Sequence, residues 1–200
     1  MMSMANHYES PPPGEQLILA STSPRRISLL KVITTEFTVV APGVEEGEIR
    51  SPDDLLTVAR RKAERVRERH PHAIVIGADT GVFRDGQAYG KARDPAEAAD
   101  ILRTLSGGWH SVWTGLALLT PSAARADVVE TQVLFKPLSE EEIRWYLSRE
   151  NVLDKAGAYA IQGRAAPFVE RIEGDFYNVM GLPLATLYRL LWAVGWRPGR

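Results

Sequence analysis

The chain of 200 residues contains no cysteine and carries a net charge of only −1 at pH 7. The first absence excludes disulfides, a thiolate nucleophile and cysteine-ligated zinc, and it fits a cytoplasmic protein. The second argues against a nucleic-acid partner held by bulk electrostatics. No apolar run is long enough to span a membrane, and residues 1–16 lack the apolar core of a signal peptide. The sequence therefore predicts a protein with neither a membrane nor a nucleic-acid partner.

Several familiar site signatures are missing as well. The chain has neither a Walker-type phosphate loop nor the glycine fingerprint of dinucleotide-binding folds. His70, His72 and His110 show no zinc-like arrangement. Any phosphate or metal chemistry must therefore come from other residues.

One stretch does indicate phosphate binding. Residues 21–26, which read STSPRR, follow the apolar run 17–20, so a buried strand is expected to end where a helix begins. Ser23 suits the N-cap and Pro24 the first helical position. The first turn of a helix offers free backbone N–H groups to an anion, and Arg25 and Arg26 supply forks that match phosphate oxygens. The alternative is an ordinary capped surface helix.

Two charged residues lie where burial is expected. Lys62 falls on the apolar stripe of a helix predicted to run from residue 52 to about residue 69. It either snorkels to solvent or points at a ligand or carboxylate. Asp79 follows the apolar run 73–76, at the carboxyl end of a predicted buried strand, where open α/β sheets place ligand-binding groups. The alternative for Asp79 and Thr80 is a local Asx or ST turn.

Three further polar residues belong to predicted loops: Glu46, Lys91 and Gln162. Each has an ordinary explanation as a solvated charge or a loop amide. Taken with the arginines, they make better sense as a site, because carboxylates hold hard divalent cations while cations hold phosphates.

The order of elements predicts an α/β fold with a mixed sheet, flanking helices and two lobes around a cleft. Helical patterns interleave with strand patterns, and adjacent strands also occur in pairs. One expected hairpin turns at Asp85 and Gly86. Another is expected to join strands over residues 168–172 and 176–180.

Short segments of the chain resemble the Maf family of nucleotide pyrophosphatases, in the family order from about residue 17 to residue 194. The matching segments are residues 21–26, 43–46, 59–63, 77–80, 90–91, 105–107, 154–159, 161–163 and 181–183. The resemblance implies one domain over residues 17–196, after a flexible extension of residues 1–16. It also implies a fold like that of the inosine triphosphate pyrophosphatases, a homodimer, and hydrolysis of a nucleoside triphosphate between its α and β phosphates.

The resemblance assigns roles to ten residues. Asp79 takes the place of the proton acceptor, and Glu46, Lys62 and Lys91 match other catalytic positions. We further predict Glu46 and Asp79 as ligands of a divalent cation, magnesium with manganese or cobalt as alternatives. The implied substrate-binding residues are Ser21, Ser23, Arg25, Arg26, Thr80 and Gln162.

The segment over residues 158–163 is similar to the branch of the family that acts on dTTP and UTP, in a house-cleaning role that extends to modified pyrimidine nucleotides. Gln162 offers a donor and an acceptor, which suits the edge of thymine or uracil. One alternative is a pyrophosphatase for 7-methyl-GTP or other modified nucleotides. The other is a nucleotide-binding regulator of cell division without turnover.

Overall fold

A mixed sheet organises the chain, whose computed structural model describes residues 16–198. Within that range the strand order is β2-β1-β3-β5-β6-β7, and β4 pairs with β3. The first three strands pair in parallel and the other pairs are antiparallel. The strands are β1 (Leu17–Leu19), β2 (Thr38–Val39), β3 (Ile74–Arg84), β4 (Gln87–Tyr89), β5 (Trp109–Leu119), β6 (Ala124–Phe135) and β7 (Val169–Glu173).

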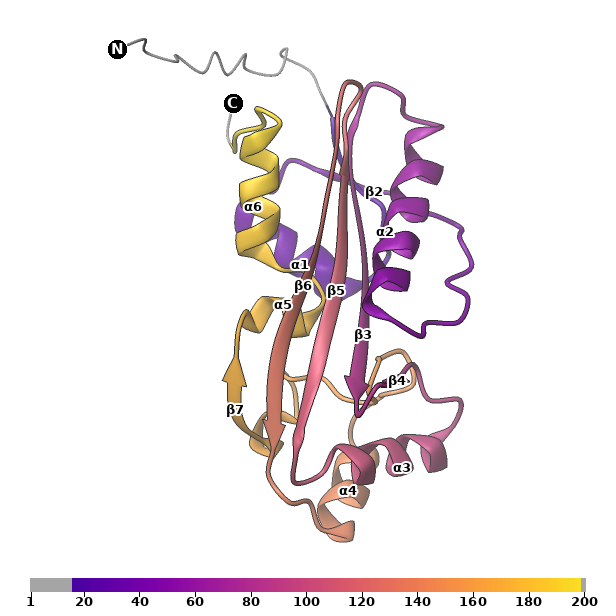
Figure 1. Ribbon diagram of the computed structural model, residues 1–200, viewed down its shortest axis with the longest axis vertical. Helices are drawn as coiled ribbons and strands as arrows, with labels where there is room; N and C mark the ends of the chain where they lie inside the picture. Colours follow the sequence, from indigo (N-terminus) through magenta and orange to yellow (C-terminus); the bar gives the residue numbers. More distant parts are fainter. Residues whose placement is uncertain (1–15, 199–200) are drawn as a thin grey trace, which may run out of the picture.

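Helices cover both faces of the sheet (Figure 1). They are α1 (Pro24–Ile33), α2 (Pro52–Arg67), α3 (Pro95–Leu105), α4 (Glu140–Leu147), α5 (Phe176–Met180) and α6 (Leu184–Ala193), with a 3₁₀ turn at Ala166–Phe168. Figure 1 shows α2 on one side of the long strands, with α1, α5 and α6 on the other and α3 and α4 at one end.

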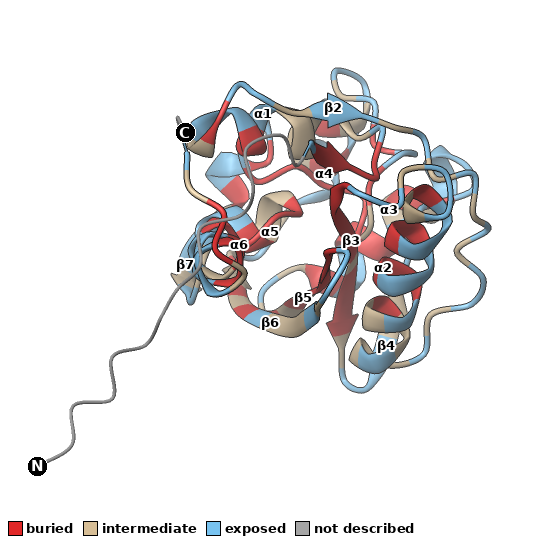
Figure 2. Cartoon of the chain, turned by 90° about the horizontal axis from the view of Figure 1, so that it is seen from above, coloured by how far each residue is buried: buried red, intermediate tan, exposed pale blue. Residues whose placement is uncertain are grey.

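The faces of β3 follow from its alternating side chains. Val75 joins the apolar cluster beneath α2, whereas Ile74 and Ile76 join the cluster beneath α1 and α6. Successive strand residues point to opposite faces, so β3 is buried on both sides, as its red colour in Figure 2 shows. In β3 up to Thr80, odd-numbered residues therefore face α2, and even-numbered ones face the side of α1 and α6.

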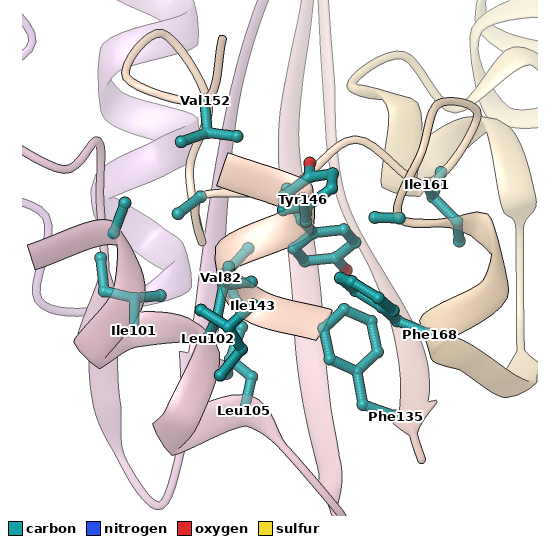
Figure 3. Close-up of a cluster of buried hydrophobic side chains, with 14 of the residues drawn as sticks. Val82, Ile101, Leu102, Leu105, Phe135, Ile143, Tyr146, Val152, Ile161 and Phe168 are labelled. Atoms are coloured by element: carbon teal, nitrogen blue, oxygen red, sulfur yellow. The ribbon is translucent and has the colours of Figure 1, made fainter. Parts of the chain in front are cut away.

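A separate apolar cluster holds α3 and α4 to the far ends of β3, β5 and β6 (Figure 3). Its aromatic rings meet edge to face: Phe168 lies 6.2 Å from Phe135 and 5.3 Å from Tyr146 between ring centroids. This geometry is the favoured one for aromatic pairs. The predicted mixed α/β fold with flanking helices is confirmed, and the separate clusters give its two lobes.

The structure corrects the prediction that a strand ends before Asp79. Strand β3 continues to Arg84, and Asp79 pairs with Gly115 in its middle. Pairing with β5 extends the strand beyond the apolar run on which the prediction was based, because strand propensity alone does not determine where a strand ends. Asp79 and Thr80 consequently form no local turn.

A second correction concerns residues 176–180, which form helix α5 and not the second strand of a hairpin. Asp175 begins the helix, because its Oδ1 accepts the backbone N–H groups of Tyr177 at 2.8 Å and Asn178 at 3.3 Å. Such caps satisfy the free donors of a first turn. The strand predicted before it is present as β7, and the hairpin at Asp85 and Gly86 is confirmed.

The predicted extension of residues 1–16 lies, except for Gln16, outside the described residues, so the division of the chain stays a prediction. Among residues 16–198, none of the helices combines the length and apolar character needed to cross a membrane.

Candidate active site

A cavity of about 470 Å³ collects all ten residues that the resemblance singled out. Its walls come from segments far apart in the sequence, among them the loop between β1 and α1, helix α2, strand β3 and the loop that carries Gln162. The ten lining residues are Ser21, Ser23, Arg25, Arg26, Glu46, Lys62, Asp79, Thr80, Lys91 and Gln162.

The loop between β1 and α1 forms one wall. Pro24 occupies the first turn of α1, as predicted, and Ser23 stands at the N-cap. The predicted N-cap position of Ser23 is thus confirmed, although its side chain makes no capping bond, and Ser21 Oγ accepts the Ser23 N–H at 3.2 Å. The N-terminus of the helix thus faces the cavity without a side-chain cap, which leaves its N–H groups available to an anion.

The two arginines of this loop differ in their contacts. Arg26 donates from Nε to the Gly181 carbonyl at 2.8 Å and from Nη2 to Thr80 Oγ1 at 3.0 Å. Arg25 reaches across the cavity, where its Nη1 lies 3.4 Å from Asp154 Oδ2. Arg26 is therefore fixed by its own lobe, while Arg25 bridges to the segment that carries Gln162.

A lysine joins the two acidic residues. Lys62 Nζ donates to Asp79 Oδ1 at 2.7 Å and to Glu46 Oε1 at 2.8 Å, with only 6% of its side chain exposed. Asp79 faces α2 because it is an odd-numbered residue of β3, and Lys62 lies on the buried face of that helix. Of the two readings of Lys62, the one with a carboxylate partner is thus correct.

Glu46 lies between two cations. Its Oε2 accepts from Lys91 Nζ at 2.9 Å, in addition to the Lys62 contact. Burial raises the pKa of Glu46, but hydrogen bonds and charge from Lys62 and Lys91 outweigh it and lower the pKa to about 2. The carboxylate is charged at neutral pH, as a cation ligand must be.

Apolar side chains also line the cavity. Val82, Val112, Tyr159 and Met180 line it, next to the exposed Gln162. The hydroxyl of Tyr159 lies 2.9 Å from His110 Nε2. A cavity lined by cations, apolar side chains and an amide suits a ligand with a polyanionic part and a flat ring.

The acidic pair fits a divalent cation only in part. Among residues 16–198 there is no group of three or more His, Cys, Asp or Glu side chains arranged to hold a metal. Glu46 and Asp79 are hard oxygen donors, and within the described chain Asp79 Oδ2 accepts no hydrogen bond. Two carboxylates suit magnesium when substrate phosphates supply further oxygens.

Sequence reasoning missed two buried residues that contact this site, Thr114 and Asn178. Thr114 Oγ1 lies 2.9 Å from Thr80 Oγ1, and it donates to the Asn178 carbonyl at 3.3 Å. Thr114 sits within an apolar strand, and nothing local distinguishes it. Only the pairing of Thr80 with Thr114 across β3 and β5 could have revealed it.

The chain is similar to known proteins over most of its length. The sequence profile of the family described as "Maf-like protein" matches residues 16–194. A "dTTP/UTP pyrophosphatase" of Geobacillus sp. (strain WCH70) is 47% identical over 185 residues, which cover 91% of this chain and all of that protein. A protein of the same name from Thermus thermophilus is 47% identical over 184 residues, which cover 91% and 96%. The structure of the Staphylococcus aureus Ham1 protein covers 90% of this chain and 99% of its own, with a TM-score of 0.49 and 14% identity.

Proposed function

The chain belongs to the Maf-like protein family, and we propose that it is a nucleoside triphosphate pyrophosphatase that hydrolyses dTTP and UTP to the monophosphate and pyrophosphate. One observation carries the proposal: an arginine-bearing helix N-terminus and a lysine-bridged pair of carboxylates line the same cavity. The first suits a triphosphate, and the second suits the activation of water beside it. The choice of thymine and uracil as the bases follows from the names of the relatives.

In the proposed reaction a water oxygen attacks the α-phosphorus, and the bond from that phosphorus to the bridging oxygen of the β-phosphate breaks. Asp79 accepts the proton of the water, and pyrophosphate leaves with the bridging oxygen. Lys62 orients the Asp79 carboxylate through its 2.7 Å contact. Arg25, Arg26 and Lys91 offset charge on the phosphates.

We assign Glu46 and Asp79 as the protein's ligands for a divalent cation, magnesium with manganese or cobalt as alternatives. Such an ion, when bound, supplies a Lewis acid that lowers the pKa of water and neutralises phosphate charge. The phosphates of the nucleotide would complete its coordination.

The test is a magnesium-dependent screen of dTTP, UTP, CTP and 7-methyl-GTP that distinguishes pyrophosphate from orthophosphate release. We expect pyrophosphate from dTTP and UTP. In isotopically labelled water the label should enter the monophosphate, because the attack is at the α-phosphorus. If 7-methyl-GTP were hydrolysed fastest, the protein would instead be a pyrophosphatase for modified nucleotides. If dTTP bound without product formation, the protein would instead be a nucleotide-binding regulator.

Gln162 is the proposed reader of the base. Gln162→Glu loses the amide donor that pairs with O4 of uracil or thymine and keeps an acceptor that suits the amino group of cytosine. We expect the ratio of kcat/KM for UTP over CTP to fall by about tenfold. Gln87→Glu, an equal change on the exposed strand β4 away from the cavity, is the control. An unchanged ratio in the Gln162 variant would remove Gln162 from this role.

A homodimer and a cytoplasmic location complete the proposal. The homodimer is inferred from the family resemblance, and the cytoplasmic location is inferred from the absence of cysteine. Light scattering on the purified full chain tests the first, with a mass twice that of the 22.2 kDa chain expected.

A further inference from the structure

Arg26 is the arginine whose direction the protein fixes. Its Nε and Nη2 donate to the Gly181 carbonyl and to Thr80 Oγ1, and within residues 16–198 its Nη1 has no hydrogen-bond partner. Arg26 also lines the cavity. Two of its three nitrogens thus hold the guanidinium in place, and the third is available to a ligand.

The direction of each hydrogen bond behind Arg26 follows from which groups can donate and which can accept. A guanidinium only donates, so Thr80 Oγ1 accepts from Arg26 and has one proton of its own to give. The nearest acceptor for that proton is Thr114 Oγ1 at 2.9 Å, because the Gly181 carbonyl lies 3.5 Å away. Thr114 in turn gives its proton to the Asn178 carbonyl at 3.3 Å.

The final acceptor in this chain is itself anchored. Asn178 is fully buried, and its amide nitrogen donates to the carbonyl of Val112 at 3.0 Å and to that of Val129 at 3.1 Å. These bonds hold helix α5 against β5 and β6. The hydrogen-bonded chain therefore runs from a rigid sheet to the cavity, and each hydroxyl in it has a defined direction.

We propose that Thr114 is a positioning residue for triphosphate binding, which acts through Thr80 on Arg26. The inference rests on the proposed function, since it assumes that Arg26 binds the phosphates. Thr114 is 0% exposed and cannot touch a substrate itself. Through Thr80, its hydroxyl holds the Arg26 guanidinium in a fixed orientation relative to the sheet. Loss of this hydroxyl should therefore weaken the binding of the phosphates and leave the base preference unchanged.

Thr114→Val tests this assignment, because it keeps the shape of the side chain and removes the hydroxyl. Thr80 then loses its acceptor, and its proton turns to the Gly181 carbonyl that Arg26 already uses. We expect Kd for inorganic triphosphate with magnesium, measured by calorimetry, to rise about threefold to tenfold. KM for dTTP and UTP should rise by the same factor, with their ratio unchanged.

Thr114→Ser keeps the hydroxyl and should restore Kd to within about twofold of the original protein. Thr104→Val, on the exposed side of α3, controls for loss of a threonine hydroxyl elsewhere. Circular dichroism checks folding, and Thr114→Ala serves as a second variant if the valine does not fold.

Three results would overturn the inference: an unchanged Kd in the valine or alanine variant, an equal loss in the serine variant, or a change of base preference at constant Kd. Failure of the proposed function would give a different result from failure of this inference. The original protein would then hydrolyse neither dTTP nor UTP, while calorimetry with inorganic triphosphate would still decide the role of Thr114.

Discussion

Asp79, the proposed proton acceptor, is expected to matter more to turnover than to the fold. Asp79→Asn keeps the volume and can still accept from Lys62 but cannot take a proton from water. We expect kcat for dTTP to fall by about 10²–10⁴-fold, the usual contribution of a general base. KM should change little in kinetics, and in calorimetry the thermal midpoint should fall only modestly because Lys62 still pairs with Glu46. Asp85→Asn, in the exposed hairpin turn, is the control, and near-normal turnover by the Asp79 variant would contradict the assignment.

The Lys62 ammonium has a consequence for metal binding. It lies within 2.8 Å of oxygens of both proposed ligands, so a cation that uses these oxygens must compete with it. Lys62→Met leaves two carboxylates without their shared cation. We expect manganese to bind the protein without nucleotide about tenfold more tightly in this variant, because a repelling charge is gone.

Electron paramagnetic resonance of free manganese measures that affinity, and Lys31→Met, on the exposed end of α1, is the matched control. The thermal midpoint of the Lys62 variant should also fall, since removing one partner leaves buried charge uncompensated. Equal manganese affinity in all three proteins would contradict the competition.

Among the elements, the helices that begin with a capping box could be predicted, and the elements governed by their neighbours could not. Ser51 and Ser139 open α2 and α4 with capping boxes that are visible in the sequence. The length of β3 was not visible, because it depends on pairing with β5. The start of α5 at Asp175 was masked by an apolar pattern that also suits a strand.

Helix α2 approaches the sheet so closely that two strand positions exclude a side chain. A Cβ at Gly115 would lie 2.4 Å from Leu56 N, and one at Gly77 would lie 2.2 Å from Ala59 O. Gly115→Ala must therefore push α2 outward, and Lys62 moves with the helix. We expect a loss of about 1–3 kcal/mol in unfolding free energy, typical of overpacking.

Chemical denaturation measures this loss, and kcat should fall as well because the contact between Lys62 and Asp79 lengthens. Gly90→Ala, where a Cβ meets nothing within 4 Å, is the control. Full stability and activity in the Gly115 variant would show that the helix tolerates the shift.

On the scale of the whole molecule, the convergence of the site could not be derived from spacing. Arg25 and Gln162 line one cavity although 137 positions separate them. Their proximity depends on how two lobes close on each other, and local patterns carry no signal for that. The resemblance to a family supplied the set of residues, and the structure added the hydrogen bonds that order them.

Acid should destabilise the whole fold through His110. Burial, with a smaller contribution from Arg84, lowers the pKa of this histidine from 6.5 to about 3. The folded state holds it neutral while the unfolded chain takes up a proton below pH 6.5, so stability is complete above that pH and falls toward pH 3. Glu46 adds to the loss only between pH 4.5 and about 2, the window between its ordinary and its lowered pKa.

Between pH 6 and pH 4.5 the histidine should therefore contribute a slope approaching about 1.4 kcal/mol per pH unit in the unfolding free energy. His110→Gln retains a hydrogen-bonding partner for Tyr159 and removes the titration, so this variant should lose that part of the slope. Urea denaturation at a series of pH values measures it, and His72→Gln, at an exposed position, should keep the original slope. Equal slopes in the two variants would show that His110 does not couple folding to proton uptake. A buried imidazole that stays neutral in the folded state must make the unfolding free energy depend on pH.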